Sequence, residues 1–334
     1  MKKHIQSLLV ITLIFGLFLL KPLHCKADAI KIHNENDFYT ALSKQISECK
    51  KHELYYISPD DLHQKITVQK NIEDDFMHHY NPKDPLLSGC YNYLCVKSYS
   101  MSWYESHSHT LNVTFEYNVI KSRKKEYMDE IEDLAKSLKR DSDFETVKAV
   151  HDYIIRRVEY DYSKKKTNYT DVEGFRDNVM VCQGYAMASY AIFAKMGIPC
   201  RIIIGHAGGD SEQNLHAWNI VQVDGKWYNY DATWDDAKGE NVSYTYFLKG
   251  KNDFPNHIAD DSYSPAELND LISDDSYHLP VSMAIHSTRF IRNILIDAGL
   301  IIINIAVIII CIKARKKQKP VGTVINDDFD KIIY

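Results

Sequence analysis

The stretch VDGKWYNYDATWDD, residues 223–236, carries the strongest fold signal in the chain. Its Asp224-Gly225 pair lies between two runs in which apolar and polar residues alternate, a pattern typical of a hairpin with a two-residue turn. We therefore expect two antiparallel strands here, at about residues 215–223 and 226–233.

The register of this hairpin is expected to bring two polar side chains together. With the Asp-Gly pair in the turn, His216 stands opposite Thr233 and Trp218 stands opposite Asp231. Because side chains alternate between the two faces, His216 and Asp231 project from the same face as diagonal neighbours within side-chain reach. The carboxylate can therefore orient the imidazole.

A cysteine upstream supplies a candidate nucleophile. Cys182 stands immediately before a predicted helix at residues 183–196, which ends at Gly197. Unpaired N–H groups and the helix dipole at this end favour a thiolate over a thiol. A thiolate, an imidazole and an orienting carboxylate form the arrangement used for acyl transfer. Cys182, His216 and Asp231 are therefore the predicted catalytic residues.

Several sequence blocks resemble the core of the transglutaminase-like superfamily, of the bacterial exported kind. Beside the hairpin they are VHDYIIRRVEYD (150–161), VCQGYA (181–186), MGIPCR (196–201), HAWNIV (216–221) and YFL (246–248). The resemblance covers about residues 125–250. It implies a papain-like α+β fold in which Cys182 is the nucleophile, His216 the general acid/base and Asp231 the orienting group. It also implies that Trp218 and Trp234 shape the active-site wall.

The groups that stabilise an oxyanion are only partly defined by the sequence. Papain-like peptidases carry a glutamine a few residues before the cysteine, and residues 175–179 contain none. The backbone N–H of Cys182 supplies one donor, while Tyr169, Tyr185 and Gln183 are alternatives for the second. Together with the two tryptophans, Gln183 and Tyr185 are the predicted substrate-binding residues.

The expected fold class is α+β, with the nucleophile at a helix N-terminus packed on an antiparallel sheet. Residues 30–122 are predicted to form a small α+β region, with a helix at 37–50, a proline-containing loop and a strand around 111–119. Its role is not apparent from its residues. Residues 123–280 are the predicted catalytic domain.

Two successive helices are expected at the start of this domain. The spacing of apolar residues predicts one at 124–140, and Ser142 with Glu145 forms a capping box for the next. His151 lies on the apolar face of that second helix and is interpreted as structural. After a strand at 201–204, the glycine-rich residues 205–209 are expected to form a flexible loop that holds His206.

The two ends of the chain predict an exported protein with a membrane anchor. Two lysines, an apolar run and a small-residue cleavage pattern identify residues 1–29 as a signal peptide. Residues 294–312 are apolar and are followed at once by five cations, which is typical of a stop-transfer transmembrane helix. A juxtamembrane linker at 281–293 and a cytoplasmic tail at 313–334 complete an arrangement in which the N-terminal ectodomain is extracellular.

Charge and cysteine content exclude several other classes. A net charge of −5 and a pI near 6.3 give no electrostatic signature of nucleic-acid binding. No C-x-x-C pair or calcium loop is present, so neither a metal nor a cofactor is expected. Seven cysteines leave an odd number, five, between the two apolar ends. Cys90 and Cys95 are close enough in sequence to pair, and Cys200 is expected to be buried and inert.

These features predict a cell-surface thiol enzyme acting on amide bonds of a protein or peptide, such as a cell-envelope or host protein. The acyl-enzyme would pass to an amine, as in a transferase, or to water, as in a hydrolase such as a peptidase or amidase. The sequence leaves these two open. The alternative is a catalytically inactive, membrane-tethered binding or scaffold module with the same fold.

Overall fold

The computed structural model describes residues 29–68, 72–103, 109–163, 166–208, 215–236 and 242–280. The chain divides into two units, Met1–Tyr277 and His278–Tyr334, and every element below belongs to the first. The predicted signal peptide up to residue 28, the linker, the transmembrane helix and the tail lie outside the described residues. Within the described ranges, no helix combines the length and hydrophobicity that a bilayer crossing requires.

The N-terminal region is a four-stranded sheet covered by short helices, as its predicted α+β character requires. The strand order is β1-β2-β4-β3, with β1 and β2 parallel and the other pairs antiparallel. The strands are β1 (Ile30–Ile32), β2 (His52–Ile57), β3 (Val96–Trp103) and β4 (Thr110–Tyr117), and the helices are α2 (Glu35–Ser47), α3 (Asp60–Val68), α4 (Ile72–His78), η1 (Pro85–Leu87) and α5 (Gly89–Tyr93). The expected proline-containing loop is therefore largely helix and strand.

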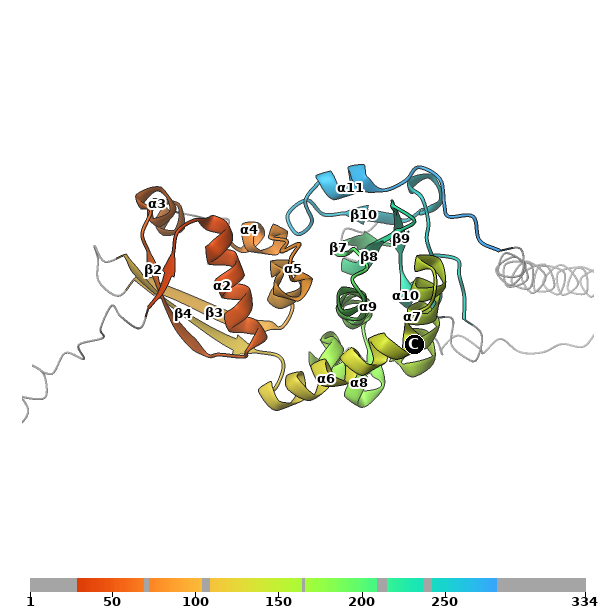
Figure 1. Ribbon diagram of the computed structural model, residues 1–334, viewed down its shortest axis with the longest axis horizontal. Coiled ribbons are helices and arrows are strands. Elements are labelled where there is room, and N and C mark those ends of the chain that lie inside the picture. The colour runs from red at the N-terminus through yellow and green to blue at the C-terminus, as the bar shows by residue number, and fades with distance from the viewer. Residues whose placement is uncertain are drawn as a thin grey trace, which may run out of the picture. The chain divides into compact units, whose positions relative to one another are not determined.

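Helix α2 begins directly after its N-cap residue Asn34 and packs on this sheet (Figure 1). The side chain of Asn34 accepts a hydrogen bond from the N–H of Asp37 at 2.9 Å, which satisfies one of the free donors of the first turn. Tyr55 of β2 donates to Gln45 at 2.8 Å, and its ring meets Phe38 edge to face at 5.9 Å. These contacts join α2 to the sheet through buried side chains.

The core of the predicted catalytic domain is an antiparallel sheet packed on helices. Its strand order is β10-β7-β8-β9. The strands are β7 (Cys200–Ala207), β8 (Leu215–Val223), β9 (Lys226–Tyr230) and β10 (His257–Ala259), with a parallel pair β5 (Glu159–Tyr160) and β6 (Val179–Met180) beside them. The helices are α6 (Lys121–Leu138), α7 (Asp143–Arg157), η2 (Lys166–Tyr169), α8 (Asp171–Asp177), α9 (Cys182–Met196), α10 (Ala232–Asp235), η3 (Lys251–Asp253) and α11 (Glu267–Leu271).

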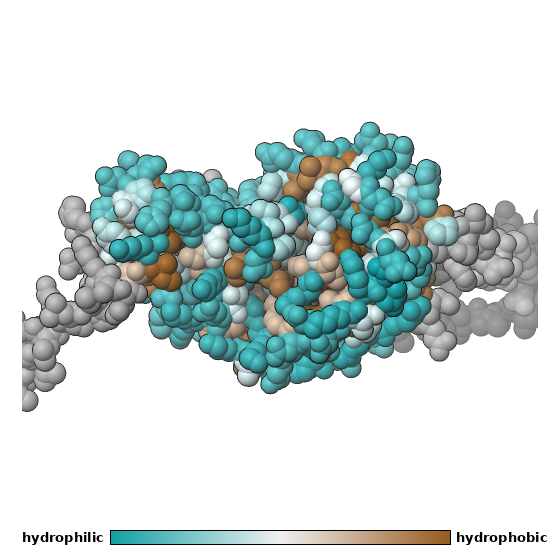
Figure 2. Space-filling model, in the orientation of Figure 1, coloured by the Kyte–Doolittle hydropathy of each residue, from teal (hydrophilic) through white to brown (hydrophobic). Residues whose placement is uncertain are grey.

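Helix α9 is the centre of this core. It contacts β7 and β8 and also the helices α6, α7 and α8 (Figure 1). All residues from Gly184 to Phe193 are buried, which explains why the helix is apolar on every side rather than amphipathic. On the face of the molecule seen in Figure 2, by contrast, hydrophilic residues cover most of the surface and hydrophobic ones form separate patches. The nucleophile candidate thus begins the most buried helix.

The hairpin forms in the predicted register but ends earlier than expected. Asp224 and Gly225 have positive φ values of 50° and 79°, as a type I′ turn requires, and pairing runs from Val223↔Lys226 to Asn219↔Tyr230. The expected pairs Trp218–Asp231 and His216–Thr233 do not form. The reason is that Asp231 leaves the strand to cap α10, where its side chain accepts from the N–H groups of the next turn.

The predicted loop at 205–209 is also wrong in its first part. Strand β7 continues through Gly205 and His206 to Ala207, because β10 pairs with it there. A Cβ atom at Gly205 would lie only 2.1 Å from the carbonyl oxygen of Ile258. This glycine therefore permits a close approach of two strands instead of loop flexibility.

The N-terminal region docks on the core through polar contacts of buried tyrosines. The hydroxyl of Tyr91 donates to Asp171 of α8 at 2.8 Å, and the hydroxyl of Tyr190 of α9 donates to the carbonyl of Pro85 at 2.7 Å. The guanidinium of Arg201 lies 3.0 Å above the ring of Tyr80. Both regions belong to the same compact unit.

The five cysteines among the described residues are free thiols. Cys90 and Cys95 are both buried without pairing to each other, so the disulfide considered from their spacing is not formed here. Burial raises the pKa of each of these two thiols to about 11. Cys200 is buried as expected, and burial raises its pKa too. Cys182 remains partly accessible.

Candidate active site

Cys182 occupies the first position of α9, one residue after the N-cap Val181. The carbonyl of Val181 accepts from the N–H groups of Gly184 at 2.8 Å and Tyr185 at 3.2 Å. The N–H of Cys182 has no acceptor within its own helix, because the first four N–H groups of any helix lack one. A side chain at Gly184 would meet Met180 Cβ at 2.8 Å, so glycine lets β6 lie close to this turn. The thiol therefore sits beside a free backbone donor.

His216 on β8 links this thiol to a carboxylate. Its Nε2 lies 2.7 Å from Oδ2 of Asp231. Burial opposes the charged form of His216, but hydrogen bonds with Asp231 and then Cys182 outweigh it and raise the pKa of His216 to about 10. Since Nε2 is bound to the carboxylate, Nδ1 is the nitrogen left for the thiol. His216 is thus bound to Asp231 through Nε2 and lines the same cavity as Cys182.

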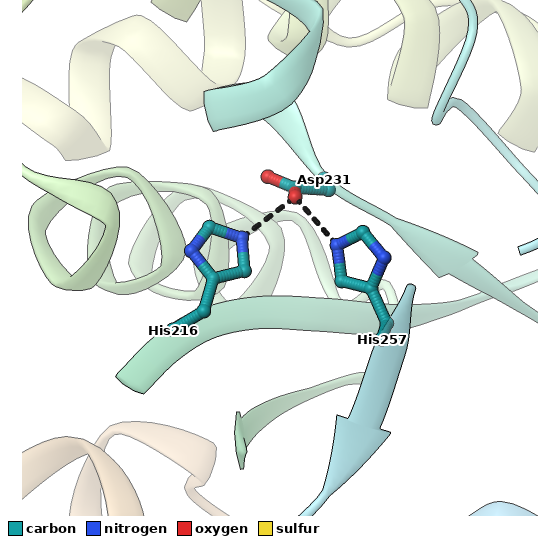
Figure 3. Close-up of side chains that lie close together, drawn as sticks. All are labelled: His216, Asp231 and His257. Atoms are coloured by element: carbon teal, nitrogen blue, oxygen red, sulfur yellow. Dashed lines mark hydrogen bonds and ion pairs between the residues drawn. The ribbon is translucent and has the colours of Figure 1, made fainter. Parts of the chain in front are cut away.

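Asp231 is held in place from two sides. Its Oδ1 accepts from the N–H groups of Thr233 at 2.9 Å and Trp234 at 3.2 Å, as the N-cap of α10. Its Oδ2 accepts from the rings of His216 and His257 (Figure 3). Burial disfavours its charge, but the bonds to these two histidines outweigh this and lower the pKa of Asp231 to about 2. The carboxylate is therefore ionised and rigidly oriented.

His257 is a residue of this site that the sequence did not reveal. It begins β10, and its Nε2 lies 3.1 Å from Asp231 Oδ2 while its Nδ1 lies 3.0 Å from the carbonyl of Pro255. The ring therefore contacts the carboxylate on one side and the backbone on the other. His257 follows Asn256 in a segment without a clear strand pattern. No local signal distinguishes it, since only the pairing of β10 with β7 brings it here.

The two tryptophans implied by the resemblance pack around the imidazole. Trp218 stacks on His216 with ring centroids 6.0 Å apart, and Trp234 lies at 5.7 Å. Trp218 is 4% exposed and belongs to a buried cluster with Ile203, Ile220, Phe254 and Ile272. The cavity beside the thiol is lined by other residues. These rings therefore pack against His216 outside that cavity, whereas the prediction placed them in the wall of the active site.

The structure separates the three alternatives for a second oxyanion donor. Gln183 lines the cavity, but its Nε2 donates to the carbonyl of Leu94 at 3.3 Å. Tyr185 is 1% exposed, donates its hydroxyl to Asp236 and is not among the described residues that line the cavity, in contrast to its predicted place. Tyr169 does line the cavity.

Tyr160 is a further candidate that the sequence reasoning missed. It lies on β5 and lines the same cavity as Cys182. Burial, followed by the negative charge of Cys182, raises the pKa of Tyr160 to about 12. The phenol therefore keeps its proton at neutral pH and is close enough to the thiolate to sense its charge. The sequence block 150–161 contains Tyr160, but nothing in that block indicates that this residue lies near Cys182 in space.

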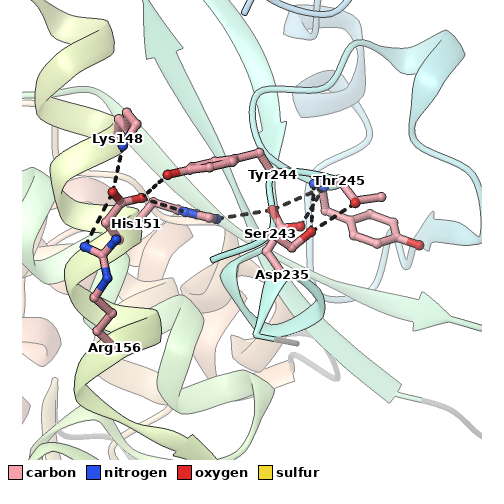
Figure 4. Close-up of polar contacts among 9 residues, drawn as sticks. Lys148, His151, Arg156, Asp235, Ser243, Tyr244 and Thr245 are labelled. Atoms are coloured by element: carbon pink, nitrogen blue, oxygen red, sulfur yellow. Dashed lines mark hydrogen bonds and ion pairs between the residues drawn. The ribbon is translucent and has the colours of Figure 1, made fainter. Parts of the chain in front are cut away.

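A second buried network supports the site from the other side of α10 (Figure 4). His151 of α7 is fully buried, and its Nε2 lies 3.2 Å from Oδ2 of Asp235 at the end of α10. Asp235 also accepts from the N–H of Tyr246. The adjacent Asp152 accepts from Lys148 at 2.7 Å and Tyr244 at 2.7 Å. The structural interpretation of His151 agrees with these contacts.

The cluster of His216, Asp231 and His257 also has ligand atoms suited to a divalent metal. These atoms lie within 4.8 Å of one another, and two imidazoles with a carboxylate suit zinc by chemistry. However, both Nε2 atoms are directed at the same oxygen, Asp231 Oδ2. The two imidazoles thus share one carboxylate oxygen as a hydrogen-bond partner.

Part of the chain that contains this site matches a known protein family. Residues 132–232 match the model of the transglutaminase-like superfamily, and this range contains Cys182, His216 and Asp231. Over 131 residues, 35% of the chain, the sequence is 26% identical to human (Homo sapiens) kyphoscoliosis peptidase and 27% identical to the mouse (Mus musculus) protein of that name. The match covers 20% of each, so the chain spans only about a fifth of their length.

Solved structures show more distant similarity. A crystal structure described as a TGase has 16% identity and a TM-score of 0.33, over 70% of this chain and 72% of that one. The periplasmic domain of TgpA from Pseudomonas aeruginosa has 18% identity and a TM-score of 0.28, over 37% of this chain and 54% of that one.

Proposed function

Since residues 132–232 carry a transglutaminase-like core, we propose that the protein is a thiol enzyme that acts on amide bonds of proteins or peptides. The observation that supports this most is that Cys182, at the start of α9, lines one cavity with His216, whose Nε2 lies 2.7 Å from the carboxylate of Asp231. A partly accessible thiol, a base with a raised pKa and an ionised orienting carboxylate have the roles that acyl transfer needs.

The proposed reaction uses each group in turn. Before the attack, the thiol proton of Cys182 has passed to His216, whose raised pKa favours the protonated ring, and the thiolate attacks the carbonyl carbon of the amide. The N–H of Cys182 donates to the developing oxyanion, which lowers the barrier most when the donor is already in place. His216 then gives its proton to the departing amine, leaving a thioester at Cys182. An incoming amine or water, deprotonated by His216, releases the acyl group and restores the thiol.

We assign the second oxyanion donor to Tyr160. Tyr160 lines the cavity that Cys182 lines, and the negative charge of Cys182 contributes to its raised pKa. Gln183 and Tyr185 already donate elsewhere, to Leu94 and Asp236. A phenol that stays protonated near the nucleophile can donate to the oxygen that becomes negative.

Alkylation tests the activated thiol. Purified protein is treated with limiting iodoacetamide at pH 6.5, and the labelled cysteines are identified by peptide mass spectrometry. Cys182 should react much faster than Cys49, which is also partly accessible but whose pKa burial raises. His216→Ala should remove this advantage. Equal rates at the two cysteines in the unaltered protein would refute an activated nucleophile.

A second experiment separates the types of turnover. The protein is incubated with a library of glutamine-containing peptides and a labelled primary amine, with Cys182→Ser as the control. Amine incorporation indicates acyl transfer, and peptide cleavage or deamidation indicates hydrolysis. If neither exceeds the control while peptides still bind, the inactive binding module is the better description.

We also propose that the enzyme works at the cell surface. This rests on the sequence of residues 1–29 and 294–312 alone, which predicts export and a single membrane anchor. Protease treatment of intact cells tests it: the ectodomain should be digested, whereas a tag placed after residue 334 should stay protected until the cells are lysed.

A further inference from the structure

A cavity of about 560 Å³ lies beside the candidate nucleophile, and part of its wall comes from outside the core. Cys182 and His216 line it together with residues of η2, β5, β7 and β8. The N-terminal region contributes Met77, Tyr93 and Leu94. Its volume falls within the range of about 300–1,000 Å³ typical of ligand sites. The space is therefore large enough for more than the reacting amide group.

The lining of this cavity is apolar and aromatic. Among the described residues that line it, none is an aspartate, glutamate, lysine or arginine. Four are tyrosines, namely Tyr93, Tyr160, Tyr169 and Tyr263, and most of the others are aliphatic. Away from Cys182 and His216, a charged side chain that entered would lose its hydration without meeting a counter-charge among the described lining residues, which is costly. Uncharged and apolar groups enter at no such cost.

The N-terminal wall is fixed to the nucleophile helix by hydrogen bonds. Leu94 ends α5, and its carbonyl accepts from Nε2 of Gln183, the residue directly after Cys182. On α5 itself, the hydroxyl of Tyr91 donates to the buried Asp171 of α8. The wall is thus held at the thiol by contacts on both sides of Tyr93.

From this lining and this attachment we propose that the N-terminal region completes the acyl-donor site. The site takes an uncharged peptide segment and places an apolar or aromatic side chain next to the reacting carbonyl, against Tyr93 and Leu94. This inference rests on the proposed thiol chemistry at Cys182 and adds its substrate class. It also gives residues 30–122 a role in specificity.

Peptidyl chloromethyl ketones test this selectivity on the full chain. Matched probes carry Phe, Leu, Lys or Asp beside the reactive carbonyl, and the rate at which each alkylates Cys182 is divided by the iodoacetamide rate of the same protein. The unaltered protein should prefer Phe and Leu over Asp by at least about tenfold, because burying an unpaired charge costs more than 1.4 kcal/mol.

A charge placed in the wall should change this preference. Leu94 is only half-buried, so a lysine is tolerated there, and Leu94→Lys should shift the Asp-to-Phe ratio towards Asp by at least about tenfold. The matched control is Leu134→Lys, at a half-buried position of α6 that does not line the cavity. It should leave the ratio as in the unaltered protein.

The outcomes distinguish this inference from the proposed chemistry. Equal rates with all four probes, or an unchanged ratio in Leu94→Lys, would overturn the substrate class even when Cys182 reacts rapidly with iodoacetamide. Slow iodoacetamide reaction at Cys182 would instead count against the thiol chemistry. In that case, binding of the same peptides, as amides without the reactive group, to Cys182→Ser is measured by calorimetry. Preference for Phe over Asp there supports the cavity assignment, and no preference refutes it.

Discussion

Asp231 accepts two hydrogen bonds from backbone N–H groups and two from imidazoles, although it is only 1% exposed. A buried carboxylate requires such compensation, because burial disfavours its charge. The capping bonds set the position of the carboxylate, and the imidazole bonds direct one of its oxygens. The residue therefore acts structurally in α10 and electrostatically on His216 at the same time.

The pKa of His216 should depend on its hydrogen bond with Asp231. Its pKa of about 10 in the folded protein lies above the ordinary value of 6.5. It therefore contributes stability that is fully present below pH 6.5 and is lost as the pH rises through 10. Asp231→Asn removes the leading cause that raises this pKa, so titration followed by the NMR shift of the ring Cε1 proton should move to lower pH. An unchanged midpoint would contradict this account.

Tyr160→Phe tests the second oxyanion donor. Removing one such donor costs a factor of about 10²–10³ in kcat. Acyl turnover should fall by this factor, with a smaller effect on KM, because the hydroxyl acts on the oxyanion and not on the bound amide. Tyr169→Phe, at another tyrosine of the same cavity, is the matched comparison. If its loss is as large as that of Tyr160→Phe, the assignment to Tyr160 fails.

His257 is a positioning residue, because it acts on the chemistry through Asp231. Losing its hydrogen bond to the charged carboxylate should lower kcat about tenfold or more in His257→Phe, with KM retained. His257→Gln keeps a donor near Asp231 and should recover much of the rate. Equal rates in both variants and the unaltered protein would exclude this role.

Helix α10 shows how a short element can be fixed at both ends. Asp231 caps its start, and Asp235 at its end meets His151 of α7 and the N–H of Tyr246. Four residues cannot form a stable helix alone, because nucleation is unfavourable. Contacts from the surrounding chain hold it, and they thereby hold the carboxylate at its first turn.

Removal of Asp235 should weaken this element. Asp235→Ala leaves Nε2 of the buried His151 without its hydrogen-bond partner, which should lower the free energy of unfolding by about 1–3 kcal/mol. Arg156→Ala breaks an ion pair with Asp152. The Arg156 side chain is 60% exposed, so this loss should cost less than about 1 kcal/mol. Urea unfolding measures both. A similar loss in the two variants would contradict the role given to the buried pair.

On the scale of the whole molecule, the N-terminal region and the core form one compact unit. Tyr91, Asp171 and the neighbouring Tyr127 lie buried where the two regions meet. Burial raises the pKa of Asp171, while the hydrogen bond that it accepts from Tyr91 opposes this. The two regions should therefore unfold together.

Tyr91→Phe tests this coupling. Loss of a buried hydrogen bond to the carboxylate should cost about 1–3 kcal/mol. Trp103 lies in the N-terminal region and the other three tryptophans lie in the core, so fluorescence with and without Trp103→Phe follows each region. Both transitions should shift together, while Tyr153→Phe on α7 should shift neither by as much. Separate transitions would show that the regions are independent.

Local patterns predicted much of the core. The Asp-Gly turn defined the register of β8 with β9, Ser142 marked the start of α7, and Gly197 marked the end of α9. These signals depend on turn chemistry and capping within a few residues, so neighbouring residues are sufficient to reveal them. Cys182, His216 and Asp231 could be selected because each stands at a fixed place in such an element.

The contacts between distant segments could not be obtained in this way. His257 reaches Asp231 because β10 pairs with β7, and Leu94 reaches Gln183 because the N-terminal region docks on α9. Tyr160 lies near Cys182 through the parallel pairing of β5 with β6. Such contacts depend on how whole surfaces pack, and no short stretch of residues encodes them. The sequence thus specified the candidate reacting groups, and tertiary packing decided which residues surround them and the cavity that they line.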